Sequence, residues 1–138
     1  KFDIPDSLNS IEADSHRLNQ VFDNILNNAT KYAPESQIWV RIKQEHDHTV
    51  ISIQDFGPGI AEKDLPFIFD RFFRSPDLSP NVHGSGLGLY ICQQIIQVHN
   101  GVITAASTFG EGTTFTITLP APIGEEGLVL DKHQEELA

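Results

Sequence analysis

Residues 23–32 read Asp-Asn-Ile-Leu-Asn-Asn-Ala-Thr-Lys-Tyr, and the rest of the chain is organised around them. At about 100° per residue of an α-helix, Asn24, Asn28 and Lys31 fall within roughly 60° of arc on one helix edge. The adjoining helix face is apolar and has to pack on another element; it consists of Leu18, Val21, Phe22, Ile25, Leu26 and Ala29. Amide oxygens can ligate a hard cation and an ammonium group can meet phosphate, so the row indicates a magnesium-phosphate edge. The alternative is a solvated helix face with two incidental asparagines.

Length and charge limit what the chain can do. Its 138 residues suffice for one domain with a single core. The net charge of −10 argues against general nucleic-acid or anionic-membrane binding, for which a basic surface is expected. The sequence shows no apolar run of membrane-spanning length and no signal-peptide pattern. It contains no methionine, so we expect a cytoplasmic fragment of a longer parent protein, whether that parent is membrane-anchored or not.

The cysteine and the histidines give no sign of a metal cage. A single cysteine, Cys92, rules out an internal disulfide and fits a reducing cytosol. It lies in an apolar helical run, which favours a core thiol over a nucleophile. The histidines show no zinc-type spacing with Cys, Glu or Asp; they are His16, His46, His48, His83, His99 and His133.

Alternation of apolar and polar residues predicts two β-hairpins. Residues 38–43 and 50–55 form the first, and residues 102–107 and 113–119 form the second across a Phe-Gly-Glu-Gly turn. Shorter extended pieces are expected nearer the N-terminus, around residues 2–4 and 11–12.

Helical signals occur at three places. The helix that carries the polar row should begin at a cap on Asp14 or Ser15 and run to about Tyr32. A short helix is expected over residues 61–69, and a longer one over residues 87–99, closed by Asn100 and Gly101. The acidic, less periodic residues 121–138 indicate a tail or linker, so the domain should span residues 1–120.

Asp55 is unusual for the end of a strand. It shares the parity of Ile51 and Ile53, so its carboxylate should point toward the buried face. Burying an unpaired charge is costly, so Asp55 needs a hydrogen-bond donor. Gly57-Pro58-Gly59 follows, a backbone that can approach a ligand closely. The alternative is a turn aspartate that caps this loop.

A loop and a glycine-rich stretch precede the longer C-terminal helix. Residues 75–85 are rich in Pro, Asn, Ser and Gly, and a loop of this length is usually functional or disordered. Glycines leading into a helix N-terminus present backbone N–H groups and the positive end of the helix dipole to phosphate. A dinucleotide-binding motif is disfavoured because no strand runs directly into these glycines.

The order and spacing of these motifs resemble the catalytic, ATP-binding domain of sensor histidine kinases. This family shares a superfamily with gyrase, the MutL repair proteins and the ninety-kilodalton heat-shock chaperones. Residues 24–32 are similar to its N box, 55–60 to its G1 box, 67–74 to its F box and 84–89 to its G2 box. The resemblance covers residues 2–120 and implies an α+β fold, the two-layer α/β sandwich of Bergerat type. Such a fold has a mixed, mostly antiparallel sheet of about five strands, about three helices on one face and a flexible ATP lid.

The resemblance also implies contacts with the base. Asp55 is similar to the aspartate that accepts a hydrogen bond from the adenine amino group, which would supply the missing donor. Gly57, Gly59 and Ile60 would pass close to the base, Tyr32 would offer its ring near it, and Thr113 matches a position that often contacts adenine through water.

Contacts with the phosphates follow in the same way. The resemblance implies that Asn24 and Asn28 hold Mg²⁺ through side-chain oxygens and that Lys31 meets phosphate oxygens. Arg71 or Arg74 would reach the γ-phosphate, although Arg71 could instead be a solvated charge. The G2 box would place backbone N–H groups on the phosphates; it consists of Gly84, Ser85, Gly86, Leu87, Gly88 and Leu89.

Asn24 also bears on the reaction. The ATP-hydrolysing clamps and serine-directed kinases of the superfamily carry glutamate there, because an attacking water or hydroxyl must lose a proton. An amide cannot act as a base, whereas a neutral imidazole attacks through an existing lone pair. We therefore predict phosphoryl transfer from MgATP to a histidine, with slow hydrolysis at most.

The resemblance places the acceptor histidine on a separate dimerising two-helix domain, which in turn serves a response regulator. The present chain is then expected to be a monomer that phosphorylates this partner domain. Two alternatives are a nucleotide-dependent clamp, which calls for glutamate at position 24, and a pseudokinase that binds ATP or only partner proteins.

Overall fold

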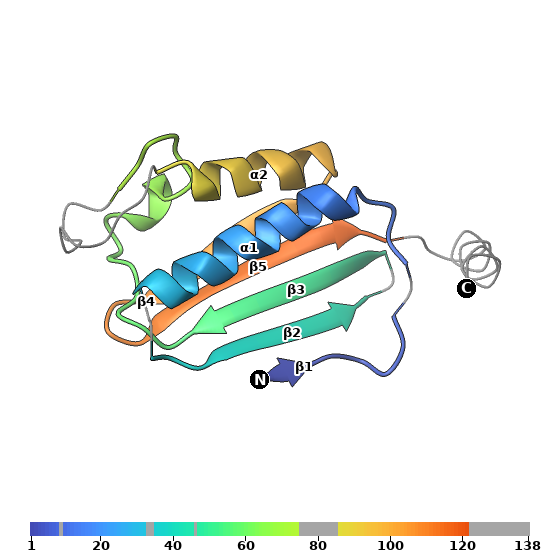
Figure 1. The fold of residues 1–138 in the computed structure, drawn as a ribbon, viewed down its shortest axis with the longest axis horizontal. Helices are drawn as coiled ribbons and strands as arrows, with labels where there is room; N and C mark the ends of the chain where they lie inside the picture. Colours follow the sequence, from blue (N-terminus) through green and yellow to red (C-terminus); the bar gives the residue numbers. More distant parts are fainter. Residues whose placement is uncertain (9, 33–34, 46, 75–85, 122–138) are drawn as a thin grey trace.

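The chain folds into two layers, a five-stranded sheet and a pair of helices on one of its faces (Figure 1). The structure is a computed structural model and describes residues 1–8, 10–32, 35–45, 47–74 and 86–121. The predicted α+β sandwich is confirmed. The expected lid over residues 75–85 and all but the first residue of the expected tail lie outside the described residues.

The sheet is mixed and mostly antiparallel, as predicted. Its strands run in the order β1-β2-β3-β5-β4. Among the described strands only the pair of β1 and β2 is parallel, and α1 supplies the crossover that parallel neighbours require. The strand bounds are Phe2–Asp3 for β1, Ile38–Gln44 for β2, His48–Asp55 for β3, Val102–Thr108 for β4 and Gly112–Pro120 for β5.

Both predicted hairpins are confirmed, because β2 pairs with β3 and β4 pairs with β5. The extended piece expected at residues 11–12 is wrong, since no strand forms there. Ile11 instead packs against the hydrophobic core from the segment that enters α1.

The two long helices begin and end close to their predicted limits. Helix α1 spans Ser15–Tyr32, and the Arg17 N–H donates to Asp14 Oδ1 at 3.1 Å, so Asp14 is its cap. Helix α2 spans Gly88–Val98 and closes where Asn100 takes a φ of 60°. No helix among the described residues is long and apolar enough to cross a membrane.

The third helix, expected over residues 61–69, is only a single 3-10 turn, η1, at Leu65–Phe67. Its i to i+3 bonding is seen in the Phe67 N–H, which donates to the Asp64 carbonyl at 2.9 Å. Pro66 has no N–H, so an α-helical ladder cannot continue through this position. The proline therefore overrides the helical pattern of the surrounding residues.

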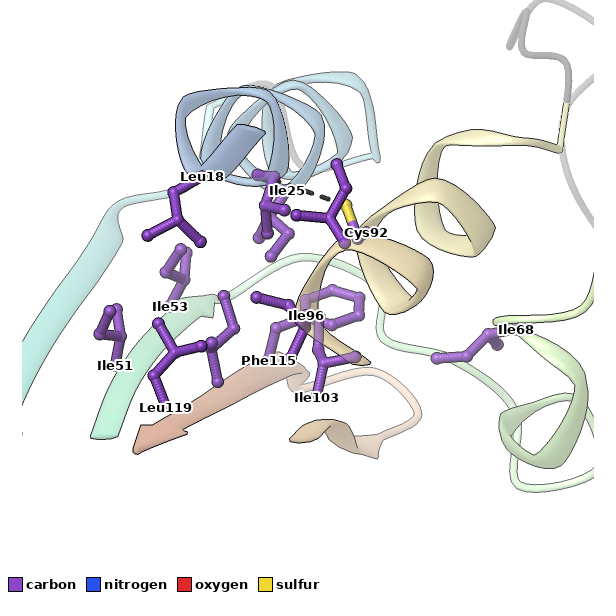
Figure 2. Close-up of a cluster of buried hydrophobic side chains, with 13 residues drawn as sticks. Leu18, Ile25, Ile51, Ile53, Ile68, Cys92, Ile96, Ile103, Phe115 and Leu119 are labelled. Atoms are coloured by element: carbon purple, nitrogen blue, oxygen red, sulfur yellow. Dashed lines mark hydrogen bonds between the residues drawn. The ribbon is translucent and has the colours of Figure 1, made fainter. Parts of the chain in front are cut away.

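The core lies between the helices and the sheet (Figure 2). Apolar side chains of β4, β5 and β3 stand side by side in rows across the sheet, with Ile103, Ile117 and Ile51 in one row and Ala105, Phe115 and Ile53 in the next. Helix α1 covers them with Leu18, Val21 and Ile25, and α2 with Cys92, Ile95 and Ile96.

Candidate functional site

One step beyond the last apolar row, the chemistry of the sheet changes. The register pairs Ser107 of β4 with Thr113 of β5, and the Thr113 N–H donates to Asp55 Oδ1 of β3 at 3.3 Å. These three residues share the parity of the apolar rows, so they lie on the helix-covered face. We call Ser107, Thr113 and Asp55 the polar row; it marks the end of the sheet where the C-terminal half of α1 and the N-terminus of α2 also lie (Figure 1).

Asp55 has the donors that its burial requires. Its Oδ1 atom accepts hydrogen bonds from the backbone N–H groups of Gly57, at 3.0 Å, and Thr113. In the described part of the chain both bonds end on the same oxygen. One carboxylate oxygen therefore fixes the side chain, and Oδ2 can serve as an acceptor for a ligand.

The loop after Asp55 is held by the β4–β5 hairpin. Gly59 has a φ of 75°, and a Cβ atom on it would lie 2.4 Å from the Thr108 carbonyl oxygen. A larger residue at position 59 would thus clash with the protein backbone itself. The Ile60 N–H donates to Ser107 Oγ at 2.7 Å, which ties the end of this loop to the polar row.

Asn24 and Asn28 of α1 lie at the edge of the core, as predicted, and both are half-buried. Asn24 Oδ1 lies 3.6 Å from the position that a Cβ on Gly88 would occupy, so the amide lies close to the first residue of α2. Asn24 also acts on Cys92, because hydrogen bonding from its side chain lowers the pKa of that thiol. The polar edge of α1 therefore lies beside the N-terminal part of α2, near Gly88 and Cys92.

Cys92 is a core thiol, as predicted. It is fully buried, and its Sγ donates to the Val21 carbonyl at 3.7 Å. Burial raises the pKa of Cys92 to about 11, and the Asn24 hydrogen bond opposes that shift only in part. The thiol is therefore protonated at neutral pH and is not suited to act as a nucleophile.

The N-terminus of α2 has the features of a phosphate site. No side chain caps it, and its first turn contains no acidic residue. The N–H groups of a first helical turn have no intrahelical acceptor, so they can donate to an anion. The Ile91 N–H makes the first bond to a preceding turn, to the Leu87 carbonyl.

Residues 67–74, which are rich in phenylalanine and contain Arg71 and Arg74, approach the same helix end through Arg71 and Phe72. The Phe72 N–H donates to the Gly86 carbonyl at 2.9 Å, and a Cβ on Gly86 would lie within 2.6 Å of the Phe72 backbone. Arg71 donates to the Tyr90 hydroxyl at 3.3 Å and lies over the Tyr90 ring at 5.1 Å. Arg71 is thus held beside the first turn of α2 by hydrogen bonding and a cation–π contact.

Comparison with protein families adds a decisive observation to this geometry. Residues 13–123 match the family described as histidine kinase-, DNA gyrase B-, and HSP90-like ATPase. The chain belongs to this family. ATP is accordingly the nucleotide for which the polar row and the N-terminus of α2 are to be considered.

This ATPase domain is similar to parts of two proteins that are named as sensors. It is 40% identical over 121 residues to the sensor histidine kinase WalK of Bacillus subtilis, and 39% identical over 111 residues to the sensor protein SrrB of Staphylococcus aureus. These matches cover 85% and 79% of the chain but only 20% and 19% of the relatives. The chain therefore spans about a fifth of their length.

Solved structures agree. The mycobacterial sensor histidine kinase MprB has a TM-score of 0.78 and 32% identity, over 90% of this chain and 85% of that one. The catalytic domain of histidine kinase ThkA has a TM-score of 0.74 and 29% identity, over 87% of this chain and 78% of that one.

The donor set of the ATPase domain fits a magnesium ion only together with a nucleotide. Among the residues that the structure describes, no group of three or more His, Cys, Asp or Glu could hold a metal. Asn24 and Asn28 offer two neutral amide oxygens, and Mg²⁺ is commonly bound by few protein ligands plus substrate phosphates and water. The two asparagines could therefore complete the coordination of a nucleotide-bound ion.

Some predicted site residues cannot be placed in this geometry. Gly84, Ser85 and the Tyr32 side chain lie outside what the structure describes. Lys31 is half-buried in the last turn of α1, and Arg74 is exposed. Leu87 directly precedes α2, and Leu89 packs against the core.

Sequence reasoning missed two residues of the site, Ser107 and Tyr90. Ser107 stands opposite Thr113 in the predicted second hairpin, so its register could have suggested it. Tyr90 lies 19 positions from Arg71, beyond an irregular segment, and no periodic pattern joins them.

Proposed function

We propose that this domain binds MgATP and transfers its γ-phosphoryl group to a histidine on a separate dimerisation and phosphoacceptor domain. It would act as the kinase module of a two-component system, upstream of a response regulator. The observation that carries the proposal is the proximity of Asn24 Oδ1 to the first residue of α2: the oxygen lies 3.6 Å from where a Cβ on Gly88 would be. It puts an amide oxygen, suited to a cation, beside a helix N-terminus suited to phosphate.

The base would bind at the polar row. Asp55 Oδ2 would accept a hydrogen bond from the adenine amino group, while Oδ1 keeps the carboxylate fixed through two backbone N–H groups. Hydrogen bonds to a charged acceptor contribute about 1.5–3 kcal/mol each, so Asp55 should dominate base recognition.

The phosphates would bind between α1 and α2. Asn24 and Asn28 would hold Mg²⁺, which neutralises charge on the phosphates, and Lys31 would meet their oxygens. The N–H groups at the start of α2, with Gly86 and Gly88, would donate to the same phosphates. ShkA, a structural neighbour at 25% identity and a TM-score of 0.74, was solved full-length in complex with AMPPNP, which supports a nucleotide at this fold.

The acceptor is inferred from what Asn24 cannot do. An amide takes no proton at neutral pH, so water or a serine hydroxyl in this site would lack a general base. A neutral imidazole needs none before it attacks. The relative WalK of Bacillus subtilis is named a sensor histidine kinase, which supports the same acceptor.

Arg71 is the better placed of the two candidate arginines. Tyr90 holds it beside the phosphate-binding end of α2, where a guanidinium could stabilise charge on the transferring phosphoryl group. Arg74 stays a second candidate for that role.

Calorimetric titration tests the nucleotide site. Wild-type protein is titrated with MgATP, and again with ATP in the presence of a chelator; we expect binding that weakens without the metal. Asn28→Asp and Asp55→Ala should each reduce affinity, the first through the metal and the second through the base. Absence of metal-dependent binding in the wild type would refute the site.

The acceptor is tested with labelled ATP and the phosphoacceptor domain of the parent protein. We expect acid-labile phosphohistidine on that domain. Acid-stable phosphoserine would contradict the proposal, and binding without any transfer would point to a pseudokinase.

Hydrolysis separates the kinase from an ATPase clamp. The wild type should hydrolyse ATP slowly, and Asn24→Glu, which supplies a potential base, should hydrolyse it faster. Unchanged or slower hydrolysis in this variant would count against the missing-base argument.

A further inference from the structure

Ser107 is the most fully bonded side chain of the polar row, and the ATPase reaction gives it no role. Its Oγ atom lies 2.7 Å from the Ile60 nitrogen, 2.8 Å from the Gly112 carbonyl oxygen and 3.0 Å from Thr113 Oγ1. A hydroxyl offers one donor and two acceptor positions, so these three contacts saturate it.

The three contacts determine where the protons lie. The Gly112 carbonyl has no hydrogen, so the Ser107 hydroxyl must donate its only proton there. The Ile60 N–H donates to Ser107 Oγ. The remaining contact is then a hydrogen bond only if Thr113 is the donor, so the Thr113 hydroxyl proton points at Ser107.

This arrangement decides what Thr113 can offer a ligand. With its proton committed to Ser107, Thr113 Oγ1 has only lone pairs left. Its neighbour in the row, Asp55, is also an acceptor, because an ionised carboxylate carries no proton. Within the polar row, Asp55 and Thr113 then offer a ligand acceptors alone, because the Ser107 hydroxyl is saturated.

We propose that Ser107 is a specificity-determining positioning residue: it fixes the Thr113 hydroxyl as an acceptor, and so makes the polar row select a base with an amino group over one with a carbonyl. The inference rests on the proposed function, since it concerns the base of the nucleotide bound there. A carbonyl at position 6 of a purine would face acceptors and lose its hydrogen bond, whereas an amino group would donate.

Removing the Ser107 hydroxyl should relax this selection. In Ser107→Ala the Thr113 proton is released and can rotate toward the ligand, where it can donate to a carbonyl. The same variant strands the Ile60 N–H, which should weaken binding of every nucleotide to a similar degree. The ratio of affinities, and not the affinity itself, therefore reports the proposed role.

The experiment measures dissociation constants for MgATP and MgITP, which differ at position 6 of the base and in the N1 proton. Wild type should favour ATP, and Ser107→Ala should lower the ITP-to-ATP ratio of dissociation constants about three- to tenfold. Ser107→Thr, which keeps a hydroxyl, should restore the ratio. Ser52→Ala on the open face of β3 is the matched control and should leave the ratio unchanged.

A double-mutant cycle identifies the route of the effect. Because Ser107 acts through the Thr113 hydroxyl, Ser107→Ala should not change the ratio in a Thr113→Val background. A change that persists there overturns the proposal, as does an unchanged ratio in Ser107→Ala alone. If Ser107→Ala does not fold, Thr113→Val alone tests the proposal. This variant removes the fixed acceptor, so it must lower the ITP-to-ATP ratio of dissociation constants.

The outcomes also separate this proposal from the proposed function. A wild type that binds neither nucleotide refutes the site and the role of Ser107 together. A wild type that favours ATP, with a ratio that none of these variants changes, refutes only the role of Ser107.

Discussion

The two ends of the sheet satisfy their polar side chains in different ways. At the site end, Asp55 is anchored through one oxygen, Oδ1. The Thr113 hydroxyl donates its proton to Ser107, and its oxygen can still accept a hydrogen bond. At the opposite end, the His99 ring uses both nitrogens: Nε2 accepts from the Asp14 N–H at 3.0 Å, and Nδ1 lies 2.8 Å from the Ile95 carbonyl. His48 likewise bonds both Asp47 and Glu45.

This difference distinguishes polar side chains with a structural role from polar side chains that can bind a ligand. A side chain whose donors and acceptors all end on the protein stabilises a turn or joins two elements. A side chain held by only some of its atoms is fixed in place and still presents chemistry outward. Between the two ends lie the apolar rows, which carry the stability that both ends depend on.

The largest expected effect comes from breaking an apolar row. Ile117 is fully buried in the middle of β5, and truncation leaves a cavity between the sheet and both helices. Ile117→Ala should lower the free energy of unfolding by about 2–5 kcal/mol. Urea denaturation measures it.

Thr116→Ala is the matched control, because Thr116 is the neighbour of Ile117 on the open face of the same strand. It should cost less than about 1 kcal/mol. Equal losses in the two variants would mean that the helices do not cover this face.

The next effect concerns the half-anchored carboxylate. Asp55→Asn keeps an oxygen for the two backbone N–H groups but replaces the second acceptor with a donor. ATP affinity should fall about 100-fold, while stability changes by less than about 1 kcal/mol. Calorimetry and urea denaturation measure the two quantities.

Asp23→Asn on the exposed side of α1 controls for the lost charge and should bind ATP as the wild type does. If Asp55→Asn also binds ATP like the wild type, Asp55 Oδ2 has no role in binding. The proposed contrast between the two ends of the sheet would then be wrong.

Regular elements were predictable because they depend on local pattern. Alternation identified both hairpins, and the parity of Ile51 and Ile53 placed Asp55 on the buried face. The helix over residues 61–69 was mispredicted because Pro66 removes an N–H that periodicity alone does not register.

Side-chain networks of the site were harder to predict. The link from Ile60 to Ser107 joins residues 47 positions apart, and it exists only because β4 pairs with β5 in one particular register. The contact between Arg71 and Tyr90 depends on how an irregular segment folds back onto α2. The sequence motifs predicted most of the residues at the site. Their hydrogen-bond partners depend on tertiary structure and could not be predicted.

Cys92 is a core residue on the side of the core that faces the site, near Asn24. Its pKa is raised from 9.0 to about 11 by burial, so the native thiol stays protonated where the unfolded thiol ionises. Unfolding then releases a proton between about pH 9 and 11, and stability falls as the pH rises through that range. By about pH 10.5 the loss should reach about 2 kcal/mol relative to pH 8.

The measurement compares the wild type with Cys92→Ala by urea denaturation at both pH values. The alanine variant lacks this proton, so the difference in stability between the two proteins should shrink or reverse at the higher pH. A difference that is independent of pH would mean that Cys92 ionises in the native state and that solvent reaches it from the site.

The smallest effect is expected at the opposite end of the sheet. The hydrogen bond to Asp47, together with the charges of Asp47 and Glu45, raises the pKa of His48 above 6.5, against a smaller opposing effect of burial. A raised histidine pKa means that the protonated ring stabilises the native state below about pH 6.5, and that this contribution disappears as the pH rises through the native pKa.

His48→Gln should therefore lower the Tm more at about pH 5.5 than at about pH 8.5. The shift should be small because the cluster is solvent-exposed and screened. A larger loss at the higher pH would show that His48 serves mainly as a neutral hydrogen-bonding group. Its charge would then not stabilise Asp47 and Glu45, and the contrast between this end of the sheet and the site would fail.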